Sequence, residues 1–200
     1  MRINMDNKAI QEFFDELAPK WDSFENGNSM KIKTLMDKLE IKKGEKVADV
    51  ACGTGVVTGL IHAYSNETVY GIDLSKKMIE EAKKKYEGRP WAVFRQGDFL
   101  LDEEYSAYDY VVIYNAYPHF LEPEKLSEAL NRVLRKGGRF AIVHSLSREQ
   151  LRKHHDSICP SISRDIASPL EESHYYQDHF STVLASEDDS SYLLIMKKKD

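Results

Sequence analysis

The sequence lacks the features that mark several classes of protein. Its 200 residues include only two cysteines, Cys52 and Cys159, and these do not form a metal-type pair, so a reduced compartment is the simpler inference. No apolar run approaches the 18 residues that would suggest a membrane span, and residues 1–6 contain no apolar signal region. We therefore expect a cytoplasmic protein with no membrane partner.

An excess of positive charge is also missing. The chain has 28 basic and 33 acidic side chains, a net charge of −5, so a nucleic acid is not an expected partner. There is no internal repeat or low-complexity tract. A hydrophobic fraction of 42% in 200 residues suits one globular domain with a sizeable core. We expect a single domain over residues 1–200, as a monomer or homodimer that acts on a small molecule.

The stretch from Lys46 to Gly59 predicts a strand, a tight glycine loop and a helix. Gly53 and Gly55 allow the backbone to approach a ligand closely, and the following helix directs unpaired N–H groups to the same place. Eighteen residues after Gly55, Asp73 ends a second predicted strand. A carboxylate there is placed to accept hydrogen bonds from ribose hydroxyls, so the pattern indicates a nucleotide cofactor.

The spacing of small residues in the loop bears on which cofactor binds. A dinucleotide-binding loop has a third small residue three positions after its second glycine. This sequence has Thr58 at that position, and Gly59 comes one residue late. A dinucleotide, and with it an oxidoreductase, is therefore disfavoured.

The loop belongs to a longer series of motifs. D-x-x-C-G-T-G, which begins at Asp49, followed by G-I-D-L-S, which begins at Gly71, resembles the first two motifs of class I S-adenosylmethionine-dependent methyltransferases. Residues 96–99, 108–112 and 134–140 resemble the next three motifs, in the family's order. The resemblance implies an α/β fold with a Rossmann-like doubly wound sheet of seven strands, mostly parallel, with a C-terminal antiparallel hairpin.

The resemblance also implies S-adenosylmethionine as cofactor, S-adenosylhomocysteine as product, and a set of binding residues. Asp49 matches the family's acid at the end of the first strand, Asp73 its ribose-binding acid and Asp98 the acid that meets the adenine amino group. Ala51 departs from the usual glycine, which matters only if the position needs positive φ. The expected cofactor-binding residues are Trp21, Asp49, Ala51, Gly53, Gly55, Asp73, Leu74, Met78, Gly97, Asp98, Phe99 and Asn115.

The N-terminal residues predict a helical segment ahead of the nucleotide fold. Apolar spacing predicts helices over 7–17 and 32–39, with a break at 19–22. Residues 14–22 are similar to the entry segment of ubiquinone-biosynthesis-like methyltransferases, with Trp21 in place of tyrosine. Residues 1–44 are therefore expected to form a lid over a core of residues 45–200. Alternatively, Trp21 covers the core, and Met78 is core filler.

From residue 46 onward, strands and helices alternate as in a parallel sheet covered by helices. The last two predicted strands are joined by six residues, too few for a crossover helix, so they must be antiparallel. A capping box at Ser147 and Gln150 predicts a short helix to about His155, followed by an irregular stretch over 156–172. The predicted strands are 46–50, 68–73, 92–96, 109–114, 139–144, 180–185 and 192–196, and the predicted helices are 56–64, 75–86, 123–135 and 147–155.

The candidate catalytic residues are Tyr117, His119 and His144. All three follow or end predicted strands at the carboxyl edge of the sheet, where the methyl acceptor should bind. A neutral imidazole there could take a proton from a thiol, phenol or amine. The competing interpretation is that the histidines are structural and that His119 binds a nearby carbonyl.

Two alternatives to a simple methyltransferase stay open. One is a non-catalytic protein that binds S-adenosylmethionine or another nucleoside. The other is a metal-assisted enzyme, since imidazoles are ligands of zinc, nickel and copper. The histidines that such a site could draw on are His119, His144, His154, His155, His174 and His179. No C-x-x-C or H-E-x-x-H motif accompanies them, and no metal is expected.

Overall fold

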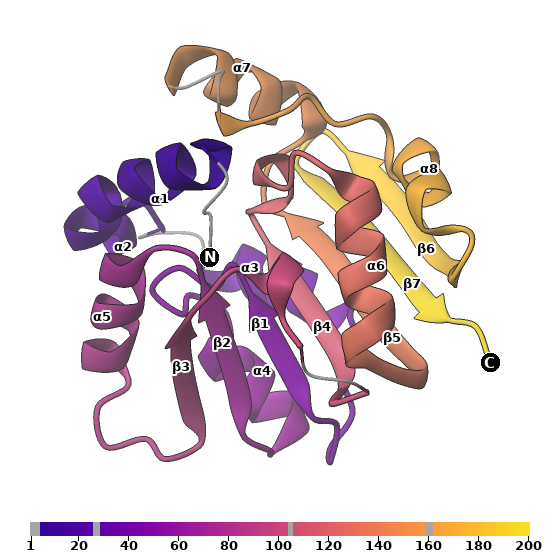
Figure 1. Ribbon diagram of the computed structural model, residues 1–200, viewed down its shortest axis with the longest axis horizontal. Helices are drawn as coiled ribbons and strands as arrows, with labels where there is room; N and C mark the ends of the chain where they lie inside the picture. Colours follow the sequence, from indigo (N-terminus) through magenta and orange to yellow (C-terminus); the bar gives the residue numbers. More distant parts are fainter. Residues whose placement is uncertain (1–4, 26–28, 104–105, 159–161) are drawn as a thin grey trace. The chain divides into compact units, whose positions relative to one another are not determined.

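Seven strands form one sheet in the order β3-β2-β1-β4-β5-β7-β6 (Figure 1). The computed structural model describes residues 5–25, 29–103, 106–158 and 162–200. The chain forms two compact units, residues 1–101 and residues 102–200. The Rossmann-like fold, mostly parallel with antiparallel C-terminal strands, is the predicted one. Over the described residues, no helix is long and apolar enough to cross a membrane.

The first unit contains three parallel strands. β1 (Val47–Val50) pairs with β2 (Val69–Asp73), which pairs with β3 (Ala92–Gln96). All four residues of β1 are buried, because helices rather than solvent cover the sheet. The helices α4 (Thr58–Ser65) and α5 (Lys76–Lys85) pack against these strands. A short 3-10 turn, η2 (Phe99–Leu101), ends the unit.

Helices precede the sheet of this unit, as the sequence predicts. α1 (Met5–Leu17) continues into the 3-10 turn η1 (Ala18–Lys20) and the short helix α2 (Trp21–Glu25). The predicted break at 19–22 is thus a change of helix type, since Pro19 fits the first turn of a helix. α3 (Ser29–Asp37) follows and buries Ile32, Leu35 and Met36.

The second unit contains both parallel and antiparallel strands. β4 (Tyr108–Tyr114) and β5 (Leu134–His144) are parallel, whereas β7 (Ser191–Lys198) is antiparallel to both β5 and β6 (Phe180–Asp188). α6 (Pro123–Val133) contacts β5, and α7 (Arg148–Ile158) follows it. The capping box of α7 is as predicted, with mutual hydrogen bonds between Ser147 and Gln150 of 3.0 and 3.3 Å.

Three boundaries in the second unit differ from the sequence prediction. The helix predicted over 123–135 ends at Val133, because Leu134 is already extended and pairs with Tyr108, and residues 135–138 then bulge before Arg139 resumes the pairing. The last hairpin has longer strands, so its turn is residues 189 and 190 and not six residues. The stretch 156–172 is not wholly irregular, since α8 (Pro169–Glu172) begins with a capping box of Ser168 and Glu171, and the 3-10 turn η5 (Ser173–Tyr176) follows.

Among the glycines of the first unit, Gly71 in β2 leaves the least room for a side chain. A Cβ atom added there would lie 2.4 Å from Cδ1 of Phe94, its partner across the β2–β3 pair, and 3.0 Å from Sγ of Cys52. We predict that Gly71→Ala lowers the free energy of unfolding by about 1–3 kcal/mol, the usual effect of overpacking.

Denaturant unfolding measures this effect. Gly97→Ala is the matched control, because the added Cβ would meet only the flexible end of Arg95. Equal stability of Gly71→Ala and the wild type would contradict the packing described for β2 and β3.

Candidate functional site

The glycine loop after β1 is held in a left-handed backbone conformation. Ala51, Gly53 and Gly55 have φ values of 52°, 52° and 78°. The sequence leaves open whether position 51 needs positive φ, and the structure answers that it does. Alanine at that φ is strained by about 1–2 kcal/mol, so the surrounding contacts must fix the loop.

Asp73, at the end of β2, is the main contact that fixes the loop. One carboxylate oxygen accepts a hydrogen bond from the Gly53 N–H (2.8 Å), and the other accepts one from the Ser75 N–H (2.8 Å). The side chain is only partly buried, and each of its oxygens has a second lone pair. Burial raises the pKa of Asp73 to about 6, while the two amide hydrogen bonds lower it. The carboxylate thus supports the loop and can still accept hydrogen bonds from a ligand.

Asp49, at the end of β1, is more deeply buried. Its Oδ2 atom accepts a hydrogen bond from the Thr58 hydroxyl (2.6 Å), while no described residue hydrogen-bonds Oδ1. Burial raises the pKa of Asp49 to about 7, and repulsion from Asp73 adds to this effect. Two carboxylates held close together without a cation suit a ligand that carries positive charge, and they would repel the pyrophosphate of a dinucleotide.

The two glycines of the loop face in different directions. A Cβ at Gly53 would lie 3.6 Å from Nε1 of Trp21 and 3.8 Å from Sδ of Met78, without a clash. A Cβ at Gly55 would lie 2.9 Å from the Tyr86 ring, so this position faces the packed interior. The space around Gly53 therefore leaves room for a ligand to approach, whereas the Cβ side of Gly55 is filled by protein side chains.

Tyr86 supports the loop from this interior side, a role that the sequence did not reveal. Its hydroxyl donates a hydrogen bond to the Gly55 carbonyl (2.8 Å) and accepts one from the Gly59 N–H (3.0 Å). Burial raises its pKa to about 12. The phenol therefore stays protonated and holds the loop to the start of α4.

Side chains of α1 and α2 contact the loops that follow all three strands of the first unit. Asp22 in α2 accepts hydrogen bonds from the Thr54 hydroxyl of the glycine loop (2.5 Å) and from Lys85 Nζ (2.8 Å). In α1, Asp15 accepts one from the Ser75 hydroxyl (2.5 Å) and one from the Lys77 N–H (2.9 Å), beyond β2.

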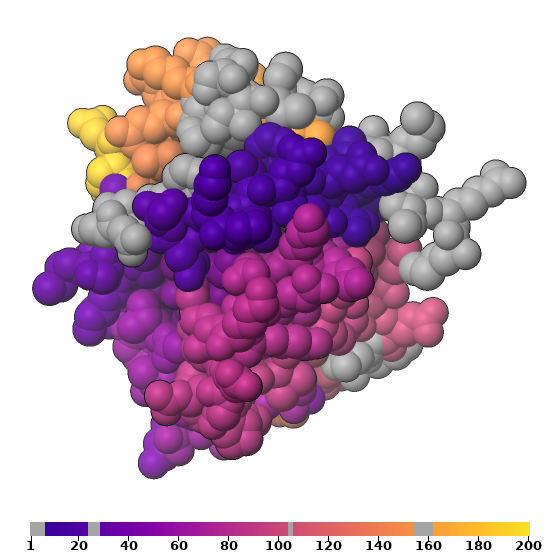
Figure 2. All heavy atoms as spheres, turned by 90° about the vertical axis from the view of Figure 1, so that its left-hand side faces the viewer, coloured from indigo at the N-terminus to yellow at the C-terminus, as the bar shows by residue number. Residues whose placement is uncertain are grey.

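The third contact lies beyond β3. Asn7 Nδ2 donates a hydrogen bond to Oδ2 of Asp98 (2.7 Å), and Asp98 Oδ1 accepts one from the Leu100 N–H (3.0 Å). The N-terminal helices thus cover the carboxyl ends of β1, β2 and β3, as a lid would. Figure 2 shows the N-terminal residues, in indigo, as a layer over the magenta residues of this unit.

Trp21 and Met78 each have two interpretations, as a cofactor contact or as a core residue. The position of Trp21 fits a cofactor contact better. It is partly exposed, packs edge-on against Phe14 (5.6 Å between ring centroids) and lies beside Gly53. Met78 is 1% exposed, so it is a core residue, yet its sulfur lies beside the same glycine.

The other expected cofactor residues of the first unit lie in the loops after β2 and β3. The Leu74 carbonyl accepts a hydrogen bond from Gln96 Nε2 (3.2 Å), and the Gly97 N–H donates to the Asp73 carbonyl (2.9 Å). Phe99 is buried at the start of η2. These contacts connect the two loops.

Asn115, expected at the cofactor, lies in the second unit and connects β4 to β5. Its φ is 52°, a conformation that asparagine tolerates. Its Oδ1 atom accepts a hydrogen bond from the Ser145 N–H (2.8 Å), and its Nδ2 atom donates to the Ser145 hydroxyl (3.0 Å). The structure therefore gives the side chain a local role at the ends of these strands.

Tyr117, a candidate catalytic residue, belongs to a buried network that the sequence did not reveal. Its hydroxyl donates to Glu172 Oε2 (2.5 Å) and accepts from the Tyr176 hydroxyl (3.0 Å). Glu172 also pairs with Arg164, at 2.7 and 3.0 Å. Burial raises the pKa of Tyr117 far above its ordinary value. With no exposed surface, Tyr117 has a structural role in this network.

The two candidate catalytic histidines differ in exposure. His119 is partly buried, and its Nδ1 lies 2.8 Å from the Ile162 carbonyl, the bond that the structural interpretation expects. In the neutral ring this contact makes Nδ1 the protonated nitrogen. His144 is fully buried, and its ring meets Tyr192 edge-on at 5.7 Å. The His144 side chain therefore has no exposed surface at the edge of the sheet where the methyl acceptor is expected.

The remaining histidines give no support to a metal centre. Over the side chains that the structure describes, no three His, Cys, Asp or Glu residues are grouped so as to hold a metal ion. His179 Nε2 pairs with Glu128 (3.1 Å) and His174 is exposed. The side chains of His154 and His155 and the whole of Cys159 lie outside the described residues.

Comparison with known proteins identifies the family. A family model described as a methyltransferase domain matches residues 48–142. A demethylmenaquinone methyltransferase of Staphylococcus saprophyticus is 32% identical over 149 residues, which make up 66% of this chain and 62% of that protein. These matches support a class I S-adenosylmethionine-dependent methyltransferase. It spans about three-fifths of the length of the curated relatives that it matches.

Solved structures of other methyltransferases share the fold. An S-adenosylmethionine-dependent methyltransferase of Aquifex aeolicus superposes with a TM-score of 0.73 at 17% identity, covering 90% of this chain and 98% of that one. The geranyl diphosphate C-methyltransferase of Streptomyces coelicolor, in complex with Mg²⁺, geranyl diphosphate and S-adenosylhomocysteine, has a TM-score of 0.69 at 15% identity, covering 86% and 81%. Both superpositions, at less than 25% identity, show that the fold is shared.

The buried Asp49 carboxyl makes the stability of this methyltransferase-family chain depend on pH. Because its pKa is raised from 3.8 to about 7, the folded state holds a proton that the unfolded state releases above pH 4. The free energy of unfolding should therefore fall as pH rises from about 4 to 7. We predict that the neutral isostere in Asp49→Asn stabilises the ligand-free protein at pH 8 by at least about 1 kcal/mol.

Thermal unfolding of both proteins between pH 4 and pH 8 measures this difference. The gain should shrink as the pH falls toward 4, where the wild-type carboxyl is itself neutral. A variant that is less stable than the wild type at pH 8 would show that Asp49 is already compensated in the ligand-free protein.

Proposed function

We propose that the protein transfers a methyl group from S-adenosylmethionine to a small-molecule acceptor by in-line displacement. The observation that carries this proposal is the pair of acids beside a strained glycine loop, the buried Asp49 and the partly buried Asp73, a site suited to a cationic nucleoside. The complex of the Streptomyces coelicolor relative with S-adenosylhomocysteine supports the choice of cofactor.

When bound, the cofactor supplies a sulfonium carbon with a good leaving group, so the protein has mainly to bind, orient and exclude water. Asp73 would accept hydrogen bonds from the ribose hydroxyls with the lone pairs that the backbone amides leave open. Asp49 would supply negative charge beside the loop, and Asp98 would accept a hydrogen bond from the adenine amino group. Trp21 and the helices α1 and α2 would keep water from this site.

Among the histidines of the second unit, His119 is the better candidate for a general base. Its ring is partly exposed, and the Ile162 carbonyl orients it through Nδ1. In the neutral tautomer, Nε2 is then the nitrogen that accepts a proton from an acceptor. His144, by contrast, is enclosed in the core.

The acceptor is sought by incubation with labelled S-adenosylmethionine and a panel of thiols, amines, phenols and metalloid ions. A demethylmenaquinol analogue belongs in the panel because of the name of the Staphylococcus saprophyticus relative. Transfer of label supports the proposal. Tight cofactor binding without transfer to any member would favour the alternative, a regulatory protein that binds the nucleoside without catalysis.

The assignment of Asp73 predicts a loss of cofactor affinity. Removing a carboxylate that binds the ribose hydroxyls should weaken S-adenosylhomocysteine binding by about 1.5–3 kcal/mol in Asp73→Ala, the range for hydrogen bonds to a charged group. Calorimetry measures the affinity. Because Asp73 also supports the loop, Ser75→Ala serves as a control that removes the Asp15 contact and the α5 cap but keeps the carboxylate. Unchanged affinity in Asp73→Ala would place the ribose elsewhere.

The comparison of His119 and His144 predicts two different defects. His119→Ala should keep its cofactor affinity and stability but lose methyl transfer by roughly 10²–10⁴-fold, the size of a general-base contribution. His144→Ala should instead lose stability, because it leaves a cavity beside Tyr192. Transfer rates, cofactor titrations and thermal unfolding of both variants make the test. A fully active His119→Ala would show that the acceptor needs no base at this position.

A further inference from the structure

The second unit contains a cleft of about 690 Å³ at the carboxyl edge of its parallel strands. Pro118 follows β4, residues 147–152 follow β5, and residues 187–189 are the end of β6 and the start of its turn into β7. The volume is that of a small-molecule site, and this edge is where open α/β sheets bind ligands. The full lining is Pro118, Ser147, Arg148, Glu149, Leu151, Arg152, Arg164, Asp165, Ile166, Glu187, Asp188 and Asp189.

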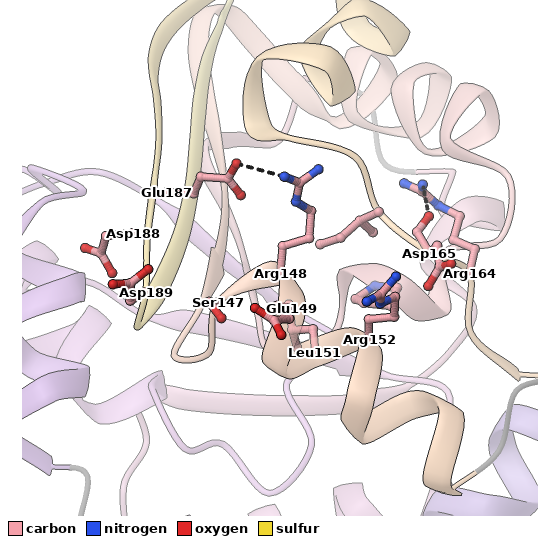
Figure 3. A pocket seen from close by; sticks show the side chains of 12 residues that line it. Ser147, Arg148, Glu149, Leu151, Arg152, Arg164, Asp165, Glu187, Asp188 and Asp189 are labelled. Carbon is pink, nitrogen blue, oxygen red and sulfur yellow. Dashed lines mark hydrogen bonds and ion pairs between the residues drawn. The ribbon is translucent and has the colours of Figure 1, made fainter.

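Charges of opposite sign lie at the two ends of this cleft. Figure 3 shows Asp188 and Asp189 at the hairpin turn on one side, and Arg152 and Arg164 on the other, with Leu151 between them. Asp188 accepts hydrogen bonds from the Ser190 N–H and hydroxyl, both at 2.8 Å, and these lower the pKa of its carboxyl group to about 2.

Some of the lining charges are neutralised within the protein. Arg148 pairs with Glu187 at 3.3 Å, and Glu149 pairs with Lys153 at 2.6 Å. Arg164 donates to both oxygens of Glu172 and to the Phe120 carbonyl, and its guanidinium lies over the Tyr117 ring. These contacts immobilise Arg164 and leave its charge balanced.

The other charges have no such partner. Neither Arg152 nor Asp189 makes a hydrogen bond or an ion pair to any residue in the described parts of the chain. The same holds for the carboxylate of Asp165, whose carbonyl accepts from Arg164 (3.2 Å). The guanidinium of Arg152 at one end and the carboxylate of Asp189 at the other are therefore available to a ligand, whereas Asp165 lies at the arginine end and Glu149 is within electrostatic reach of Arg152.

The floor between the two ends is apolar. Leu151 and Ile166 are buried, with 5% and 8% exposure, and Pro118 is buried beside them. Such a surface suits a short hydrocarbon chain, which would bridge the two polar ends.

We propose that this cleft binds a small zwitterion, with its ammonium group at Asp188 and Asp189 and its carboxylate at Arg152. A dicarboxylate would bring one of its charges next to Asp188 and Asp189, and a diamine would bring one next to Arg152, so both are disfavoured by like-charge repulsion. The site lies within the second unit, and the proposal stands whether or not S-adenosylmethionine binds to the first.

Titration of the full-length protein with a series of ω-amino acids tests the proposal. The probes are γ-aminobutyrate, δ-aminovalerate and ε-aminocaproate, compared with butylamine, butyrate, putrescine and glutarate, and binding is followed by NMR chemical shifts and thermal unfolding. At least one amino acid should bind more tightly than every singly charged or like-charged compound, and its affinity should fall with added salt. Equal affinity for butylamine or butyrate, or no binding by any amino acid, would overturn the proposal.

Three variants at two sites, Arg152 and Lys125, make the test specific. Both sites are exposed, so the variants should fold, and thermal unfolding checks that they do. Arg152→Gln should weaken amino-acid binding about tenfold, whereas Lys125→Gln, which removes a cation from α6, should not. Arg152→Glu should reverse the preference so that putrescine binds better than the amino acid. If Arg152→Glu binds the amino acid as well as the wild type does, Arg152 does not hold the carboxylate.

Discussion

The hydrogen bonds between Asp73 and the backbone amides of Gly53 and Ser75 are the constraint on which the first unit depends. In the glycine loop, Ala51, Gly53 and Gly55 all have positive φ. A backbone of this kind persists only where the surrounding contacts fix it. Asp73 fixes the loop from the end of the neighbouring strand, through the Gly53 N–H, and Tyr86 fixes it from the packed interior, through the Gly55 carbonyl. A single carboxylate thereby links the end of β1, the end of β2 and the start of α5.

This arrangement places two acids, Asp49 and Asp73, where their charged forms lower the stability of the fold. Asp49 and Asp73 are close enough for each to raise the other's energy when charged, and burial raises the pKa of both. A protein selected only for stability would replace Asp49 with a neutral residue. Its presence is consistent with a ligand that brings positive charge to the loop. The strain at Ala51 is of the same kind, because it belongs to the loop that the proposed function assigns to cofactor binding.

Much of this was predictable from the sequence because the relevant signals are local. The alternation of strands and helices, the glycine loop and the capping box at Ser147 each depend on residues that are neighbours in the chain. The features that the sequence does not reveal depend on distant contacts. Tyr117 follows a strand end, but its burial depends on Glu172, 55 positions later, which accepts a hydrogen bond from its hydroxyl in the core. His144 likewise gained its burial from Tyr192 on a strand that no motif connects to it.

The contacts of the N-terminal helices were hidden for the same reason. Asp22 is the last residue of the segment that resembles the N-terminal segment of ubiquinone-biosynthesis-like enzymes. The sequence of that segment does not predict that Asp22 hydrogen-bonds Thr54 and Lys85. Asn7 and Asp98 are 91 positions apart. Spacing can place a polar residue on a helix, but only the fold decides which loop it meets.

The Asn7 contact has a consequence for how tightly any ligand is held. The amide of Asn7 donates to Oδ2 of Asp98, the acid that the proposed function assigns to the adenine amino group, and would share that carboxylate with a bound nucleoside. Where the nucleoside has to displace the amide, its observed affinity is lower than the intrinsic one by the fraction of molecules in which the amide has left. Under the proposed function, the first helix would then lower the affinity for substrate and product alike.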